Sequence, residues 1–168
     1  MRIAVTGTPG TGKSTAVEAV ETDLDVVHLN DVIREEGLTT DHDEDRDSAV
    51  ADLDAVADSL AGRDDVLFES HLAHHFDADR VVVLRCHPET LVDRLRERGE
   101  PREKAEENAE SEALDVILAE AVDRHGEDSV YEVDTTNLTP AETADAIERV
   151  VAGERGPSAG TVSFIDYL

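Results

Sequence analysis

The strongest constraint on the fold lies near the start of the chain, where an apolar run leads into a glycine-rich turn. Residues 3–5 read Ile-Ala-Val, and the segment Gly7-x-x-x-x-Gly12-Lys13-Ser14 then fills every fixed position of the phosphate-binding P-loop pattern. Such a loop follows a buried strand and opens a helix, which directs unpaired N–H groups toward an anion. The sequence therefore predicts a strand–loop–helix unit at the start of an α/β fold.

The residue types in this loop suit the binding of phosphate groups. The glycines at 7, 10 and 12 leave backbone N–H groups free to approach an anion, because they carry no Cβ atom. Lys13 can reach the outer phosphates of a triphosphate, and the Ser14 hydroxyl can be a ligand of Mg²⁺. This pattern predicts nucleotide binding, but by itself it does not indicate which reaction follows.

Composition and charge exclude several classes of protein. The 168 residues include 41 Asp and Glu against 15 Lys and Arg, so the formal net charge is −26, and only two of the cations are Lys. Such a charge argues against broad attraction to nucleic acid or to anionic membranes. We interpret the acidic excess as typical of a halophilic surface, because a Debye length of ~3 Å at 1 M salt would relieve the self-repulsion.

Cysteine content and hydropathy indicate where the protein works. The single cysteine, Cys86, excludes an internal disulfide and fits a reducing compartment. No apolar run approaches the ~20 residues that a membrane-spanning helix needs. The chain starts directly on the first predicted strand, so we expect no signal peptide. We therefore expect a cytoplasmic protein without membrane association.

Strand and helix patterns alternate along the chain. The expected strands are residues 2–6, 24–29, 66–69, 80–85 and 129–134. The expected helices are residues 12–22, 30–36 (capped by Asn30 or Asp31), 48–60, 88–98, 101–124 and 140–151, with a polar acidic loop at 39–47. This alternation predicts a five-stranded parallel sheet with helices on both faces and ligands beyond the carboxyl ends of its strands.

The other motifs narrow the class of P-loop protein. GTPases carry an N-K-x-D motif after a late strand, whereas residues 135–138 here read Thr-Thr-Asn-Leu. Motor and helicase ATPases need a longer chain. A small kinase is the remaining interpretation.

Five stretches together resemble the small adenylate kinases of the isoenzyme 6 type. They are residues 6–15, 30–37 (Asn-Asp-Val-Ile-Arg-Glu-Glu-Gly), 69–71 (Glu-Ser-His), 94–99 (Arg-Leu-Arg-Glu-Arg-Gly) and 137–140 (Asn-Leu-Thr-Pro). The resemblance covers residues 1–152, the expected kinase domain, and ends before the linker and tail at 153–168. It implies phosphoryl transfer from Mg-ATP to AMP, together with ATPase activity and a role in small ribosomal subunit maturation with a small-subunit ribosomal protein.

The resemblance also implies roles for single residues. The residues that would bind ATP phosphates are Gly10, Gly12, Lys13, Ser14 and Thr15. Residues 28–51 would form the monophosphate-binding region, with Arg34 on the acceptor phosphate. Residues 97–107 would form a short lid, with Arg98 on the donor phosphates. Asn137 would line the adenine pocket through backbone contacts.

One position departs from the family pattern. His71 falls on the histidine of the family's Asp-x-His motif, which makes it a third catalytic candidate beside Lys13 and Arg98. The Asp of that motif is Glu69 here, one methylene longer, and we expect it to hold Mg²⁺ through a bound water.

The chemistry of phosphoryl transfer supports the arginine assignments independently. Moving a phosphoryl group between two anions requires positioning and charge cancellation, and the planar guanidinium fork binds phosphate oxygens in pairs. In a chain so poor in cations, we favour this role over a surface ion pair for Arg34 and Arg98. We interpret Arg94 and Arg102 as solvated helix positions.

Three histidines follow the third predicted strand, and histidine-rich patches can bind zinc. No cysteine lies near them in sequence, and their spacing matches no common zinc pattern. We therefore interpret His71 as a residue near the phosphates, and His74 and His75 as surface residues.

Two functional alternatives and the tail stay open at this stage. In one alternative, nucleotide binding switches a ribosome-assembly ATPase and kinase turnover is incidental. In the other, the acceptor is a small metabolite, which hydroxyl-directed carboxylates would recognise in place of a cationic anchor. The tail either packs on its own domain or docks on a partner, and alternating Val162, Phe164 and Asp166 predict an extended, edge-pairing strand.

Overall fold

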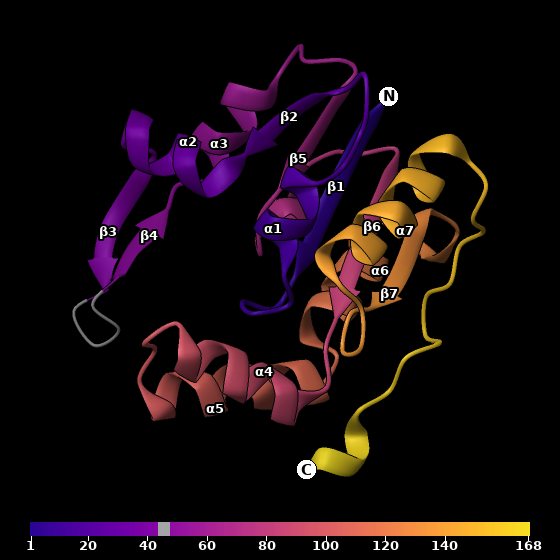
Figure 1. Ribbon diagram of the computed structural model, residues 1–168. Coiled ribbons are helices and arrows are strands. Elements are labelled where there is room, and N and C mark those ends of the chain that lie inside the picture. Colours follow the sequence, from indigo (N-terminus) through magenta and orange to yellow (C-terminus); the bar gives the residue numbers. More distant parts are fainter. Residues whose placement is uncertain (44–47) are drawn as a thin grey trace.

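The computed structural model describes residues 1–43 and 48–168 (Figure 1). Its main sheet is parallel with the strand order β2-β5-β1-β6-β7. The strands are β1 (Arg2–Gly7), β2 (Asp25–His28), β5 (Val66–Glu69), β6 (Arg80–Arg85) and β7 (Val130–Asp134). All five lie within two residues of the predicted ranges, so the predicted sheet is confirmed.

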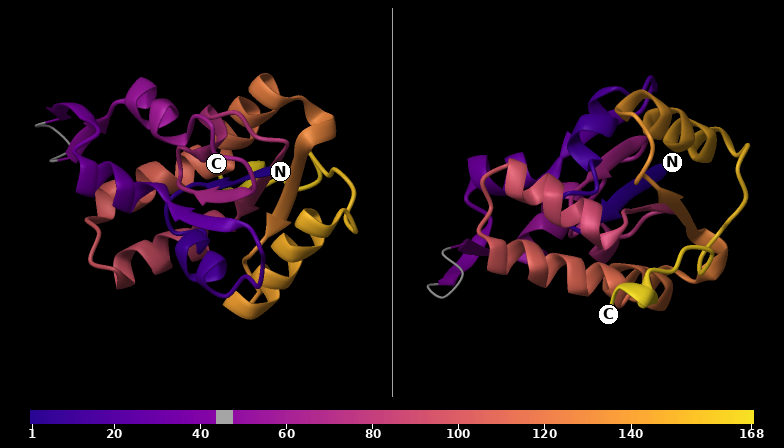
Figure 2. Two further views of the ribbon diagram at one scale, coloured as in Figure 1. Left: turned by 90° about the horizontal axis from the view of Figure 1, so that it is seen from above. Right: turned by 60° about the horizontal axis from the view of Figure 1, so that its bottom comes forward.

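Alternate residues of each strand face opposite layers of helices. Ile3 and Val5 pack with α1 (Lys13–Glu18) and α7 (Pro140–Ala152), whereas Ala4 and Phe68 pack toward α3 (Leu53–Leu60) and α6 (Val116–His125). In the left view of Figure 2, α1 and α7 lie below the sheet, and α3 and α6 lie above it. Since both faces are covered, the central strands are apolar without alternation.

The carboxyl ends of the strands open between two peripheral units. On one side lie α2 (Leu29–Glu36) and the antiparallel pair β3 (Thr39–Asp43) and β4 (Ser48–Ala51). On the other side, α4 (Pro88–Glu97) packs on α5 (Arg102–Ala113) around Leu91, Leu95 and Ala105. Figure 1 shows these two units flanking the edge where β1 ends. This edge is where the fold class binds its ligands.

The region before α3 departs from the prediction. The expected loop at 39–47 and helix at 48–60 are instead a two-stranded hairpin and a shorter helix, with residues 44–47 lying outside the described part of the chain. Asp52 sets the start of α3, because its Oδ1 accepts a hydrogen bond from the Ala55 N–H at 3.1 Å. In the part of the chain that the structure describes, β3 and β4 form a two-stranded sheet of their own, and their sequences, Thr-Thr-Asp-His-Asp and Ser-Ala-Val-Ala, show no alternation of apolar and polar residues that would predict strands.

Two helix predictions were too long. The first helix ends at Glu18 with 3₁₀-type hydrogen bonds at Ala19 and Val20, four residues before the expected end. The expected helix 101–124 is divided into α5 and α6 at Asp115, whose φ of 56° is left-handed. The Asp115 carboxylate pairs with the buried Arg85, a tertiary contact that sequence periodicity does not reveal.

The tail packs along β7 and across the end of the sheet (Figure 1). The Ser158 N–H donates to the Val130 carbonyl at 3.0 Å, and the Thr161 N–H donates to Glu132 Oε2 at 2.8 Å. Phe164 meets the His87 ring edge to face at 5.4 Å. Residues 165–167 form a 3₁₀ turn, so the predicted extended strand is wrong there. Docking on a partner stays a prediction.

None of the helices in the described ranges is long and apolar enough to cross a membrane.

Candidate active site

The P-loop conformation depends on glycine at two positions. Gly7 has φ +150°, and a Cβ there would lie 2.6 Å from the Leu84 carbonyl oxygen. Gly10 has φ +94°, and its Cβ would press on the Leu95 side chain at 3.0 Å. The loop is therefore packed against β6 and α4, and an L side chain would displace it.

The buried Lys13 side chain contacts the backbone of the loop. Its Nζ donates to the carbonyl oxygens of Gly7 at 2.8 Å and Thr8 at 3.1 Å. The pKa of Lys13 is lowered from 10.5 to about 8, chiefly by burial; the Glu69 carboxylate opposes this shift, and the nearby Arg98 adds to it. A phosphate group in the loop would supply the counter-charge that this buried ammonium lacks.

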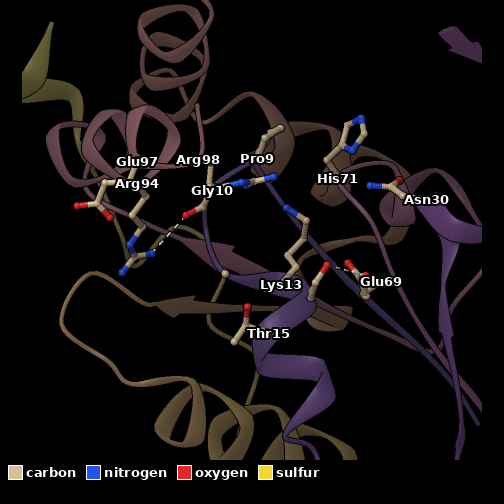
Figure 3. A pocket seen from close by; sticks show the side chains of 12 residues that line it. Pro9, Gly10, Lys13, Thr15, Asn30, Glu69, His71, Arg94, Glu97 and Arg98 are labelled. Atoms are coloured by element: carbon tan, nitrogen blue, oxygen red, sulfur yellow. Dashed lines mark hydrogen bonds between the residues drawn. The ribbon is translucent and has the colours of Figure 1, made fainter. Parts of the chain in front are cut away.

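A cavity of about 560 Å³ opens over the loop (Figure 3). It is lined by Pro9, Gly10, Gly12, Lys13, Ser14, Thr15, Asn30, Glu69, His71, Arg94, Glu97 and Arg98. Eight of these are residues that the sequence assigned to the site. Figure 3 shows the side chains of Lys13, Arg98 and His71 converging on this cavity from separate elements.

Asn137 is the ATP-site candidate that does not line this cavity; it lies exposed in the loop after β7. Its neighbour Thr135 reaches the P-loop instead, with Oγ1 2.9 Å from the Thr11 carbonyl oxygen. The adenine contact of Asn137 stays a prediction.

Glu69 joins the end of β5 to the start of α1. Its carboxylate is 2% exposed, and Oε1 accepts the Ser14 hydroxyl at 3.1 Å and lies 2.7 Å from His28 Nδ1. A hydroxyl and a carboxylate are oxygen donors of the kind that Mg²⁺ prefers. This ion usually retains several water ligands when it binds to a protein. Ser14 and Glu69 thus fit the predicted metal site, Ser14 as a direct ligand and Glu69 through water.

Two arginines near the carboxyl end of α4 border the P-loop cavity, Arg94 within the helix and Arg98 at its C-cap. Arg94 donates to the Gly10 carbonyl at 3.4 Å and to the Thr135 carbonyl at 3.0 Å, so its interpretation as a solvated position is wrong. Arg98 makes no hydrogen bond or ion pair within the described part of the chain, although it borders the cavity. Arg102 is exposed and pairs with Glu106 at 2.8 Å, which confirms its surface role.

A buried ionic network underlies the loop, and no local pattern in the sequence predicts it. Arg85 pairs with Glu112 at 3.2 Å and with Glu132 at 2.6 Å, all three being 3% exposed or less. Glu112 Oε1 also accepts the Thr8 hydroxyl at 3.3 Å, and its Oε2 accepts the Cys86 N–H at 2.8 Å. The network fixes α5 and β7 relative to the P-loop, a condition for a precise site.

A second cavity, of about 620 Å³, adjoins the first. Its lining residues are Asn30, Ile33, Arg34, Gly37, Thr39, Val50, Ala51, Leu53, His71 and Leu72. Asn30 and His71 border both cavities. Arg34 is largely exposed and pairs with Asp31 at 2.6 Å. Such an exposed pair contributes ~0–1 kcal/mol, so an incoming anion could take the place of Asp31.

His71 is neutral where the cavities meet. Its pKa is lowered to about 4, chiefly by burial and to a smaller extent by the positive charge of Lys13. His74 is buried at 1% exposure, so its assignment to the surface is wrong, and His75 is half-buried. Both side chains point toward α6, where they contact Glu120, and away from the P-loop cavity.

The site combines a P-loop, two adjoining cavities and arginines from a lid-like helix pair. This combination is typical of the class of P-loop kinases. Residues 3–115 match a family model described as an AAA domain. A protein of Natronomonas pharaonis named "Putative adenylate kinase" is 67% identical over 168 residues, covering the whole of both chains. The chain therefore belongs to an adenylate kinase-like family.

More distant relatives bear the same name, and solved structures share the fold. A protein of Methanosarcina acetivorans is 43% identical, covering 90% of this chain and 86% of its own. Shikimate kinase from Acinetobacter baumannii in complex with shikimate superposes with a TM-score of 0.62 at 16% identity, covering 92% and 94% of the two chains. Deoxyadenosine kinase from M. mycoides with bound dCTP superposes with a TM-score of 0.58 at 16% identity, covering 91% and 100%. These two show the fold alone.

Proposed function

We propose that the protein transfers the γ-phosphoryl group of Mg-ATP to AMP, as a nucleoside monophosphate kinase of the isoenzyme 6 type. The observation that supports this most is the contact between the two cavities at Asn30 and His71. An in-line transfer requires donor and acceptor phosphates to meet at one place, held from both sides. The P-loop cavity suits the donor, and the cavity beside Arg34 suits the acceptor.

In this proposal each side chain compensates negative charge or sets orientation. Lys13 and Arg98 contact donor phosphates, and Arg34 turns from Asp31 to the acceptor phosphate. Mg²⁺ bound by Ser14 and Glu69 would neutralise charge between the outer donor phosphates. These five side chains come from the P-loop, from the end of β5 and from the ends of α2 and α4, all at one edge of the sheet.

The transfer itself needs no general base on the protein. An acceptor phosphate oxygen forms a bond to the γ-phosphorus while the bond from that phosphorus to the bridging oxygen breaks, leaving ADP on both sides. The second pKa of a phosphate monoester is ~6, so at neutral pH the attacking oxygen carries no proton. The neutral His71 is consistent with this, since it can orient a phosphate oxygen by donating a hydrogen bond without titrating.

The lining of the second cavity favours a nucleotide over a polyol metabolite. Ile33, Leu53 and Leu72 give it apolar walls on which a base could lie. Among the described residues, no carboxylate lines it and Arg34 is the lining cation. A sugar-like acceptor would need hydroxyl-directed carboxylates, so we place the small-metabolite kinase second.

ATP hydrolysis, small ribosomal subunit maturation with a ribosomal protein partner, and a cytoplasmic location rest on the resemblance and composition. We retain the assembly-ATPase switch as the alternative of a different class. It differs from a kinase in one measurable property, since its turnover of ATP would not depend on AMP.

A coupled ADP-release assay in molar salt tests the proposal, with ATP alone, with ATP plus AMP, and with ATP plus shikimate. We expect turnover to depend on AMP. Arg34→Ala should raise the KM for AMP about 10- to 150-fold, because a charge-assisted phosphate contact is worth ~1.5–3 kcal/mol. Arg149→Ala, which removes an exposed arginine paired with Asp145 at 3.0 Å, is the matched control and should behave as the unaltered protein. AMP-independent turnover, or dependence on shikimate, would refute the assignment.

A further inference from the structure

A cluster of metal-ligating side chains lies outside both cavities, on the α6 side of the sheet. His74 and His75 belong to the 3₁₀ turn η1 (Ala73–His75) that follows β5, and Glu120 reaches them from α6. His74 Nε2 lies 2.7 Å and His75 Nε2 lies 3.6 Å from the same carboxylate oxygen, Glu120 Oε2. The two imidazole rings stand with their centroids 4.3 Å apart. All three ligand atoms lie within 4.8 Å of one another.

The surroundings hold this cluster in place. His74 is 1% exposed, and its other ring nitrogen, Nδ1, lies 2.7 Å from the Thr6 hydroxyl on β1. His125 also contacts the turn, since its Nε2 lies 2.8 Å from the His74 carbonyl oxygen. Histidines that bind metal are commonly oriented in this way, through a hydrogen bond to the ring nitrogen that does not ligate.

The cluster is also open on one side. The side chains of His75 and Glu120 are 35% and 46% exposed, whereas that of His74 is 1% exposed. An ion can therefore enter from solvent past His75 and Glu120. A fourth coordination position would face this opening.

The donor set identifies the class of ion. Two imidazoles with one carboxylate suit zinc and similar transition metals, whereas Mg²⁺ prefers all-oxygen sites. Zn–N and Zn–O bonds of about 2.0–2.2 Å place tetrahedral neighbours roughly 3.3 Å apart, a value bracketed by the 2.7 and 3.6 Å separations here. Burial also lowers the pKa of His74, which favours the neutral imidazole that binds metals.

We propose that His74, His75 and Glu120 form a zinc-class transition-metal site that ties the turn after β5 to α6. Without metal, His74 can carry its proton on Nε2 and donate it to Glu120 Oε2, while Nδ1 accepts a hydrogen bond from the Thr6 hydroxyl. When an ion binds Nε2 of both neutral rings, each ring keeps its single proton on Nδ1 instead, so that His74 Nδ1 then donates to the Thr6 hydroxyl. Thr6 directly precedes Gly7, and His71 lies three residues before His74, so the site stiffens the base of the phosphate cavity without contributing to it.

Zinc chloride titration of the full chain tests this proposal, in molar salt, with excess Mg²⁺ and without nucleotide. We expect one equivalent of zinc to bind. At free zinc a hundredfold above Kd, the ratio of folded to unfolded protein rises about 100-fold. For a chain of this size the Tm then rises by roughly 5–10 °C. Cobalt(II) in place of zinc should give the visible absorption of a low-coordinate site.

The variants separate this site from the acidic surface, which could also attract cations. His75→Ala and Glu120→Gln change partly exposed side chains, and each should weaken zinc binding at least tenfold and abolish the cobalt absorption. Asp123→Asn, an exposed carboxylate on the same helix, should bind as the unaltered protein does. If His75→Ala retains the full zinc stoichiometry and Tm shift, or if the unaltered protein binds no zinc at micromolar concentrations, the cluster is only a hydrogen-bonded contact and the proposal is wrong.

Discussion

ATP binding should weaken steeply above neutral pH because of Lys13. In the free protein burial lowers the pKa of this ammonium from 10.5 to about 8. Phosphate groups in the P-loop would raise it again, since they supply the missing counter-charge. The bound state therefore holds a proton that the free state loses above pH ~8. By linkage, affinity falls as pH rises through the free-state value.

The size of the effect follows from the two pKa values. If the bound pKa returns to 10.5, the Kd for Mg-ATP should be about tenfold weaker at pH ~9 than at pH ~7, and about 150-fold weaker near pH ~10.5. About 0.9 proton should be taken up on binding at pH ~9, and about 0.1 at pH ~7. His71, with a pKa of about 4, does not titrate in this range.

Isothermal titration calorimetry in molar salt measures both quantities, because buffers of different ionisation enthalpy report proton uptake. Lys13→Arg keeps a cation that does not titrate below pH ~12, so its Kd should be nearly flat over the same range. The hydrogen bond to Asp65 raises the pKa of the amino terminus, but Asp65 precedes β5, so both groups lie at the edge of the sheet opposite the cavity. A constant Kd for the unaltered protein between pH ~7 and ~9 would refute the account of Lys13 as a buried ammonium lacking a counter-charge.

Three further outcomes follow from the structure. Arg98→Ala should lower kcat about 100- to 1000-fold with a smaller change in KM, as expected for an arginine that acts on charge developing in the transition state; steady-state kinetics in which only KM changes would contradict this. Thermal melts should show Tm rising between ~0.1 and 2 M salt, because screening relieves the repulsion of a −26 chain, and a flat profile would argue against that account. A chain ending at Val151 should keep AMP-dependent turnover but melt roughly 3–12 °C lower, since Phe164 no longer covers Arg85 and His87; loss of turnover in a folded truncated protein would place the tail in the active site.

Sequence reasoning succeeded where local pattern determines structure. The P-loop is one contiguous motif, and the central strands β1, β5 and β6 are apolar runs, so they could be located without tertiary information. The predicted helix at 140–151 is α7, and the structure shows that its start is set locally by a capping box of Thr139 and Glu142, with reciprocal hydrogen bonds of 3.1 Å. These elements require no knowledge of what packs on them.

It failed where a distant partner decides a residue's role. Arg94 resembles any charged position on a helix, and only the approach of Gly10 and Thr135 makes it part of the loop. His74 and His75 lack zinc spacing in sequence because the third candidate ligand, Glu120, comes from a helix 45 residues beyond His75. Such contacts are consequences of topology, and periodicity carries no information about them.

The acidic composition and the site are related through screening. With 41 carboxylates against 15 Lys and Arg, every exposed cation has candidate partners, and several arginines are paired: Arg34 with Asp31, and Arg149 with Asp145. Arg98 borders the cavity without a partner in the described ranges, so its charge is available to a ligand. At molar salt the surface field that repels ATP decays within ~3 Å, whereas the buried charge of Lys13 is screened much less. Molar salt would therefore both relieve the repulsion within this acidic surface and allow the proposed binding of an anionic nucleotide.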